Sequence, residues 1–199
     1  GFRGEALYTI GAVSRMTITT RPRDGGDVGT EVRVVGGEVE AVKPAGRAPG
    51  TTVTVRDLFF NKPARRKFLK TDVTEFGHVN RVVTRYALAN PEVAITLTHD
   101  GTDVFSTTGR GDLQETIHAV YGRDVATGMI DVDADLDGRI EAVRGYVSDP
   151  ETTRASREYV STFVNGRYVR EGLLRDAILS AYGNQLAPDR YPFAVLFLE

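Results

Sequence analysis

The sequence contains no cysteine, carries little net charge and has no long apolar run, and each absence narrows what the chain can be. Without cysteine, disulfide bonds and zinc–thiolate sites are both excluded, and the composition is compatible with a reducing cytoplasm. A net charge of −2 gives no global attraction to nucleic acid, so a surface of that kind must be a local basic cluster. No run approaches the roughly 18 apolar residues of a membrane span, and no signal-peptide pattern opens the chain. We therefore expect a cytoplasmic protein without a membrane partner.

The composition is nevertheless that of a folded protein. Apolar residues make up 41% of the 199 positions, which is enough for one large domain or two small ones. The chain does not begin with methionine, it opens inside a glycine-rich motif, and it stops directly after the apolar run 193–198. We therefore expect it to be a fragment of a longer protein.

The stretch from Pro49 to Leu69, PGTTVTVRDLFFNKPARRKFL, organises the first half of the chain. Thr and Val alternate from Thr51 to Val55, which is typical of a half-buried strand. The apolar residues 58–60 then enter a core, and Asn61 and Pro63 suit the start of a short basic helix. Such a joint fixes a strand and a helix at once, so we expect it to carry a mechanical signal.

Periodicity predicts an α+β fold for the rest of the chain. A glycine-rich turn leads into a helix over residues 5–15, and strands over 16–20, 30–35, 39–43 and 51–55 form a mostly antiparallel sheet. Further predicted elements are helices over 72–90, 113–121 and 172–182, hairpins over 93–107 and 159–169, and strands over 129–132, 140–148 and 193–198. The last strand is almost wholly apolar, so we expect it at the centre of a sheet. The small, polar stretch 109–112 is the best internal boundary.

Two of the predicted helices have apolar stripes that we expect to face inward. In helix 172–182 the stripe consists of Leu173, Leu174, Ala177, Ile178 and Ala181. In helix 72–90 it consists of Phe76, Val79, Val82, Val83 and Tyr86, opposite a polar side with Thr74, His78, Arg81 and Arg85.

The opening motif, Gly1-Phe2-Arg3-Gly4-Glu5, places two glycines before a helix. Free backbone N–H groups and the positive end of the helix dipole can cradle a phosphate there. The same glycines would equally serve a tight turn before a packed helix. The residues alone leave both interpretations open.

Basic residues gather after the joint. Arg65, Arg66 and Lys67 lie in the short basic helix that ends the stretch 49–69, Lys70 follows it directly, and Arg81 and Arg85 lie one turn apart on the next predicted helix. Such a set can track a DNA backbone, with affinity that falls as salt rises. It can also be a solvated face, and Arg65 or Arg66 can pair with Asp57 in a structural role. Arg167, Arg170 and Arg175 are weaker candidates for DNA contact.

Neither a metal site nor a catalytic group is predicted. Residues 133–140 copy the first eight positions of an EF-hand loop, but the twelfth position is Arg144 instead of a glutamate. We expect a solvated acidic turn there. His78, His99 and His118 are scattered, without a partner at metal-ligand spacing and without a nucleophile triad.

Three motifs together resemble the MutL family of DNA mismatch-repair ATPases. They are GFRGEAL at Gly1–Leu7, GTTVTVRDLFFNKPARRKFL at Gly50–Leu69 and FVNGRYV at Phe163–Val169, and the resemblance extends over essentially the whole chain. The family belongs to the GHKL group, with gyrase-type topoisomerases, Hsp90 chaperones and histidine kinases. The resemblance implies the C-terminal half of a GHKL ATPase α/β sandwich over residues 1–108. A transducer domain of the ribosomal-protein-like βαβ type, truncated at its C-terminus, would follow over residues 109–199.

The resemblance also implies where ligands bind. The glycine-rich segment, made of Gly1, Phe2, Arg3, Gly4 and Glu5, would end the lid over ATP and place its backbone amides near the β- and γ-phosphates. Thr51 matches a threonine on the floor of the adenine pocket.

For DNA, the family has basic residues in its binding groove at the places of Lys70 and Arg85, which we therefore rank highest. Arg81 and Arg66, from the basic cluster described above, follow them.

The family's chemistry implies that this chain alone is inactive. The water-activating Glu, the Mg-binding Asn and the Asp that reads adenine lie upstream of GFRGEAL in the family, and a Lys that reaches the γ-phosphate follows the last strand. Without a general base and a metal ligand we expect no ATP hydrolysis by the 199 residues. The parent would bind ATP and Mg, form a homodimer, and couple a MutS-like mismatch sensor to strand processing on DNA, at the nucleoid if it is prokaryotic.

Two other interpretations remain open at this point. One is a non-catalytic nucleic-acid-binding or scaffold module on the same fold. The other is a topoisomerase-type ATPase subunit, which should lack PARRKFL and FVNGR. Fold alone does not choose among the three, whereas these motif strings favour mismatch repair.

Overall fold

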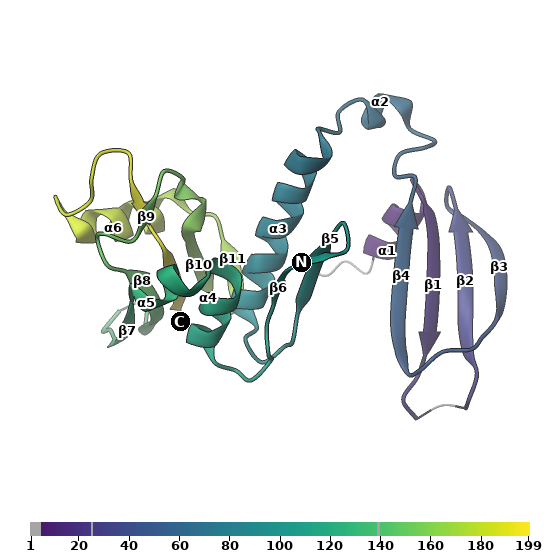
Figure 1. The fold of residues 1–199 in the computed structure, drawn as a ribbon, viewed down its shortest axis with the longest axis horizontal. Coiled ribbons are helices and arrows are strands. Elements are labelled where there is room, and N and C mark those ends of the chain that lie inside the picture. The colour runs from purple at the N-terminus through teal and green to yellow at the C-terminus, as the bar shows by residue number, and fades with distance from the viewer. Residues whose placement is uncertain (1–4, 25, 139) are drawn as a thin grey trace. The chain divides into compact units, whose positions relative to one another are not determined.

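A computed structural model of the chain describes residues 5–24, 26–138 and 140–199. The chain folds into two compact units, one ending at Thr71 and the other running from Asp72 to Glu199 (Figure 1). Both units combine helices with antiparallel strands, which confirms the α+β class. The functional division expected at residues 108/109 stays a prediction. No helix among the described residues is long and apolar enough to span a bilayer.

The first unit is a four-stranded antiparallel sheet with two short helices. The strand order is β3-β2-β1-β4, and all three pairings are antiparallel, which agrees with the predicted mostly antiparallel sheet. The elements are α1 (Ala6–Gly11), β1 (Arg15–Arg21), β2 (Gly29–Val35), β3 (Glu38–Ala45), β4 (Gly50–Arg56) and α2 (Pro63–Arg66).

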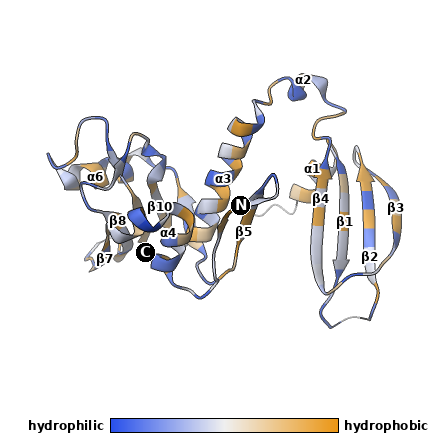
Figure 2. Cartoon of the chain, in the orientation of Figure 1, coloured by the Kyte–Doolittle hydropathy of each residue, from blue (hydrophilic) through white to orange (hydrophobic). Residues whose placement is uncertain are grey.

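The register of this sheet collects apolar side chains on one face. Met16 lies opposite Val34 on one neighbouring strand and Val55 on the other, and because side chains alternate, the face continues two residues along each strand. Figure 2 shows these apolar residues interspersed with polar ones along β2 and β4. Helix α1 packs against the face closely: a Cβ on Gly11 would lie 3.0 Å from Met16 Cε and 3.2 Å from Val34 Cγ1.

The second unit contains a five-stranded sheet with order β11-β10-β13-β8-β7. Strand β13 pairs in parallel with β10 and antiparallel with β8, so the apolar last strand is central, as predicted. The elements are α3 (Asp72–Ala89), β5 (Thr96–His99), β6 (Thr102–Ser106), α4 (Leu113–Tyr121), α5 (Arg123–Thr127), β7 (Met129–Asp135), β8 (Ala142–Ser148), β9 (Thr153–Arg154), η1 (Arg157–Tyr159), β10 (Val160–Val164), β11 (Arg167–Val169), α6 (Gly172–Tyr182), β12 (Tyr191–Pro192) and β13 (Ala194–Leu198).

The core of this unit lies between the sheet and helices α3, α4 and α5. The helices contribute Leu88, Ile117 and Val125, and the sheet contributes Phe163 and Val195; all are at most 2% exposed. The elements therefore stay together through burial of large apolar side chains, each of which is worth roughly 1.5–3 kcal/mol.

The predicted helix faces are wrong for α3 and partly wrong for α6. In α3 the buried residues are Thr84, Ala87 and Leu88, whereas Val79, Val82 and Tyr86 are 49, 50 and 65% exposed. In α6 only Tyr182 is buried, and Leu173 is 79% exposed. Hydropathy misplaced most of the stripe on α3, where Phe76 and Val83 are only half-buried and the buried positions include the less apolar Thr84 and Ala87.

The acidic segment that imitates an EF-hand begins in a strand and leaves it after Asp135. Residues up to Asp135 continue β7, and Arg144 of the neighbouring β8 forms ion pairs with Asp133 at 3.2 Å and Asp135 at 2.9 Å. The hydrogen bond to Asp135, followed by the charge of Asp133, raises the pKa of Arg144. The expected acidic turn is therefore wrong for residues 133–135, whereas residues 136–138 are exposed and lie outside the strands. The cation at the twelfth position serves cross-strand pairing.

Candidate functional site

The second unit has a cavity of about 380 Å³ whose wall is rich in arginine, which we call the arginine pocket. Its charged lining comprises five arginines, one histidine and two glutamates. The lining residues are His78, Arg81, Val82, Arg85, Arg157, Glu158, Val160, Thr162, Tyr168, Val169, Arg170, Glu171 and Arg175. Cations outnumber anions even with the histidine neutral, so the pocket attracts negative charge.

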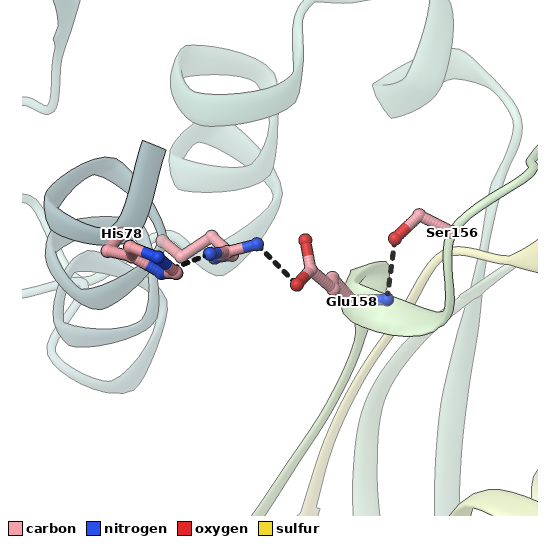
Figure 3. Close-up of polar contacts among 4 residues, drawn as sticks. His78, Ser156 and Glu158 are labelled. Atoms are coloured by element: carbon pink, nitrogen blue, oxygen red, sulfur yellow. Dashed lines mark hydrogen bonds and ion pairs between the residues drawn. The ribbon is translucent and has the colours of Figure 1, made fainter. Parts of the chain in front are cut away.

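Three polar lining residues of helix α3, His78, Arg81 and Arg85, lie on one side of the helix. They occupy positions i, i+3 and i+7, which share a helical face. Figure 3 shows the resulting chain of contacts, which runs from His78 through the Arg81 guanidinium to Glu158. The Glu158 backbone N–H donates to Ser156 Oγ at 3.3 Å, at the start of η1. Because arginine only donates, His78 Nδ1 must accept, which places the proton of a neutral ring on Nε2.

Arg85 is positioned by an aromatic ring. Its guanidinium carbon lies 4.1 Å from the ring centroid of Tyr168 on β11, a cation–π contact. Such a contact orients the guanidinium without neutralising it. Within the described residues no carboxylate forms an ion pair with Arg85. Arg85 therefore presents a full positive charge at a fixed place in the pocket.

A smaller cavity of about 150 Å³ shares Arg81, Arg85 and Glu158 with the arginine pocket, and we call it the hydroxyl cavity. Its other lining residues are Asn80, Thr84, Val120, Tyr121, Tyr159 and Ser161. Burial raises the pKa of Tyr121 to about 12, although the neighbouring Ser161 hydroxyl acts in the opposite direction. The phenol is therefore neutral at physiological pH and can donate a hydrogen bond.

The residues that we expect to contact DNA are distributed over both units. Arg81 and Arg85 line the arginine pocket, together with the weaker candidates Arg170 and Arg175, while the weaker candidate Arg167 does not line it.

Arg66 ends α2 and Lys70 follows it, and both are exposed residues of the first unit. The structural alternative, in which Arg65 or Arg66 pairs with Asp57, is wrong, because Asp57 pairs with Arg15 at 3.4 Å.

Most of the residues expected at the nucleotide lie outside the described part of the chain. These are Gly1, Phe2, Arg3 and Gly4. Glu5 is exposed and precedes α1. Thr51 is exposed on β4, where its hydroxyl lies 2.7 Å from that of Thr20 on β1.

The joint after β4 is tied to the residues that follow α1. Phe59 N–H donates to the Val13 carbonyl at 2.7 Å, and Asn61 Nδ2 donates to the Ala12 carbonyl at 3.0 Å. Phe59 has φ of 62°, which is strained for an aromatic residue. A displacement of α1 therefore has a direct hydrogen-bonded path to the start of α2 within this unit.

Sequence reasoning missed Glu158 and Tyr168 as partners of the arginines. Glu158 lies 77 residues from Arg81, and no local pattern joins the two. The only available signal was the motif FVNGRYV, which contains Tyr168.

Comparison with known proteins gives a consistent result. A family model described as "DNA mismatch repair protein, C-terminal domain" matches residues 117–199. The DNA mismatch repair protein MutL of Halobacterium salinarum is 62% identical over the whole chain, and that of Lacticaseibacillus paracasei is 48% identical. The chain spans 30% of the length of these two curated relatives.

Solved structures agree with the sequence relatives. The Aquifex aeolicus MutL ATPase domain complexed with ADP matches with a TM-score of 0.79 and 30% identity, covering 99% of this chain and 72% of that one. A structure described as the N-terminal domain of a DNA repair protein matches with a TM-score of 0.82 and 26% identity, covering 100% of this chain and 64% of that one.

Proposed function

Because this chain belongs to the MutL family of DNA mismatch repair proteins, we propose that it is part of a protein that binds and hydrolyses ATP to couple mismatch recognition to strand processing. The observation that carries the proposal is the match over 99% of the chain to a MutL ATPase domain that is described with ADP bound. A MutS-like sensor supplies the mismatch signal, and the full-length protein works as a homodimer on DNA in the cytoplasm. Within this scheme residues 109–199 act as the transducer domain.

The nucleotide site uses the start of the chain and β4. Gly1, Phe2, Arg3, Gly4 and Glu5 surround the phosphates of ATP with backbone N–H groups. Thr51 lies at the adenine, and Mg is held by residues outside these 199. The hydrogen bonds from the joint to Val13 and Ala12 support a relay in which closure over the nucleotide moves α1 and, through it, the segment that leads to α2.

Thr51→Val in the full-length protein is expected to weaken ATP binding about fivefold, because one hydrogen bond is worth about 1 kcal/mol. Thr52→Val is the matched control, since neighbouring side chains of a strand point to opposite faces. Isothermal titration with a non-hydrolysable ATP analogue gives both affinities. Equal affinities in wild type and Thr51→Val, or a larger loss in Thr52→Val, would contradict the assignment of Thr51.

DNA is bound through the basic residues Lys70, Arg85, Arg81 and Arg66. We expect Arg85 to contribute most to DNA affinity. The Tyr168 ring holds its guanidinium in place and, unlike a carboxylate, leaves its positive charge available to a phosphate. The contact is to phosphates, so it is independent of base sequence.

Arg85→Glu is expected to lower DNA affinity at every sequence and to reduce the slope of log affinity against log salt by about one. Arg123→Glu, which changes an exposed arginine of α5 outside the pocket by the same charge, should keep the wild-type slope. Fluorescence anisotropy with two unrelated duplexes at four salt concentrations measures both quantities. If both variants change the slope equally, the effect is one of net charge and the pocket is not the contact.

A non-catalytic binding module is the competing interpretation. Full-length protein that binds DNA but releases no phosphate from ATP in the presence of Mg would favour that module over the ATPase.

A further inference from the structure

The hydroxyl cavity contains a buried hydroxyl that makes no well-formed hydrogen bond to any described residue. Ser161, on β10, is 1% exposed, and within the described part of the chain its Oγ makes no hydrogen bond of acceptable geometry, although the Tyr121 phenol is a near neighbour. A buried hydroxyl left unsatisfied destabilises the fold, because its lost hydration is not replaced by another hydrogen bond. A ligand that accepts a hydrogen bond from Ser161 Oγ would remove this cost.

The remaining groups of the cavity select the charge of that ligand. Arg81 and Arg85 are donors that cannot lose their proton, and the phenol of Tyr121 stays protonated. Guanidinium groups and hydroxyls together match a tetrahedral oxyanion, which offers several acceptor oxygens. The volume of about 150 Å³ is below the 300 Å³ or more of typical pockets for larger organic ligands, so a small anionic group fits and a whole nucleoside does not.

Glu158 is the one anion that lines this cavity. Its carboxylate forms an ion pair with Arg81, and it is held in place by the hydrogen bond of its own N–H to Ser156. A carboxylate that pairs with a binding arginine competes with any incoming anion for the same guanidinium (Figure 3).

We propose that Arg81, Arg85, Tyr121 and Ser161 bind one phosphate group, and that Glu158 occupies Arg81 until the phosphate arrives. The phosphate is either free or part of a nucleic acid, since both present the same tetrahedral oxyanion. In the second case the site deepens the proposed function by naming where a DNA phosphate is held. The arginine pocket then forms the approach, with Arg157, Arg170 and Arg175 attracting the polyanion.

Three substitutions in the full-length protein separate this proposal from a structural role. Ser161→Ala is expected to weaken binding of inorganic phosphate about tenfold, because a buried hydrogen bond to an anion is lost. Glu158→Gln is expected to strengthen it by a similar factor, because the competing charge is removed. Ser180→Ala, an exposed hydroxyl on α6, is the matched control and should bind phosphate as wild type does. An ion pair with a purely structural role would predict weaker or unchanged binding for Glu158→Gln.

Phosphate affinity is measured by isothermal titration, and competition with a short duplex identifies the source. Displacement of phosphate by the duplex assigns the site to nucleic acid, and simultaneous binding assigns it to free phosphate; either outcome supports the site. Absence of phosphate binding, or equal affinities in wild type, Ser161→Ala and Glu158→Gln, would overturn it. DNA binding with the wild-type salt slope in that case would leave the proposed function intact, whereas phosphate binding without DNA binding would reject DNA contact and keep the site.

Discussion

Gly145→Val is expected to prevent the second unit from folding. Gly145 lies in the middle of β8 with φ of 131°, a conformation that residues with a Cβ rarely adopt. A Cβ at this position would overlap the carbonyl oxygen of Val195 on β13 and would lie 3.3 Å from the Cα of Leu196. The obstacle is backbone of the central strand, so no side-chain rotation relieves it, and we expect a loss above about 4 kcal/mol. Circular dichroism and hydrogen exchange at the amides of Ala194–Leu198 measure the outcome.

Gly77→Ala provides the matched control with the opposite sign. Gly77 lies inside α3, where an added Cβ has no atom within 4 Å outside the helix's own nearby backbone. Alanine favours the helix interior over glycine by about 0.5–1 kcal/mol, so the second unit should become slightly more stable. A Gly145→Val protein with native exchange protection would show that β8 and β13 are not paired as described.

Phe193→Ala is expected to destabilise the second unit by about 3–5 kcal/mol, the usual cost of removing a fully buried aromatic side chain. Phe193 is 1% exposed, and its ring centroid lies 4.7 Å from that of Tyr159 and 5.2 Å from that of Tyr121. The Arg154 guanidinium lies 5.2 Å from the same ring. The substitution therefore leaves a cavity and removes aromatic contacts worth about 0.5–1.5 kcal/mol each.

Urea denaturation of Phe193→Ala and Phe68→Ala compares the same chemical change at a buried and an exposed position. Phe68 is 78% exposed, and its replacement should change the free energy of unfolding by less than about 0.5 kcal/mol. Similar midpoints for the two variants would contradict the position of Phe193 in the core.

Elements whose formation depends on local interactions were predictable. The predicted hairpins 93–107 and 159–169 turn at Asp100-Gly101 and Asn165-Gly166, which adopt the positive φ angles that such dipeptides favour in tight hairpins. Helix 113–121 begins where expected, because Asp112 accepts a hydrogen bond from the Glu115 N–H at 3.0 Å. Turns and helix caps depend on residues that are close together in the sequence, so the sequence alone is enough to predict them.

Features that depend on distant partners were not predictable. Hydropathy predicted that Val82 and Tyr86 face inward on α3. In the structure both are exposed, and Thr84 and Ala87 are buried instead. The sequence left the basic residues open between DNA contact and a solvated face, and it did not reveal that Arg81 pairs with Glu158 and that Arg85 lies over the Tyr168 ring. Periodicity identifies a helix and its polar side, but it does not identify which residue from another strand meets that side.

The order of strands along the chain has a consequence for synthesis on the ribosome. Strand β13 joins β10 to β8, yet it is the last of the three to be translated. Until it emerges, β8 and β10 each expose a row of unpaired backbone N–H and C=O groups to solvent. A nascent chain that pauses before Ala194 therefore has two unpaired strand edges that can pair with other chains. We expect chaperone holdases to bind the nascent chain at this stage and to release it once β13 has paired with β8 and β10.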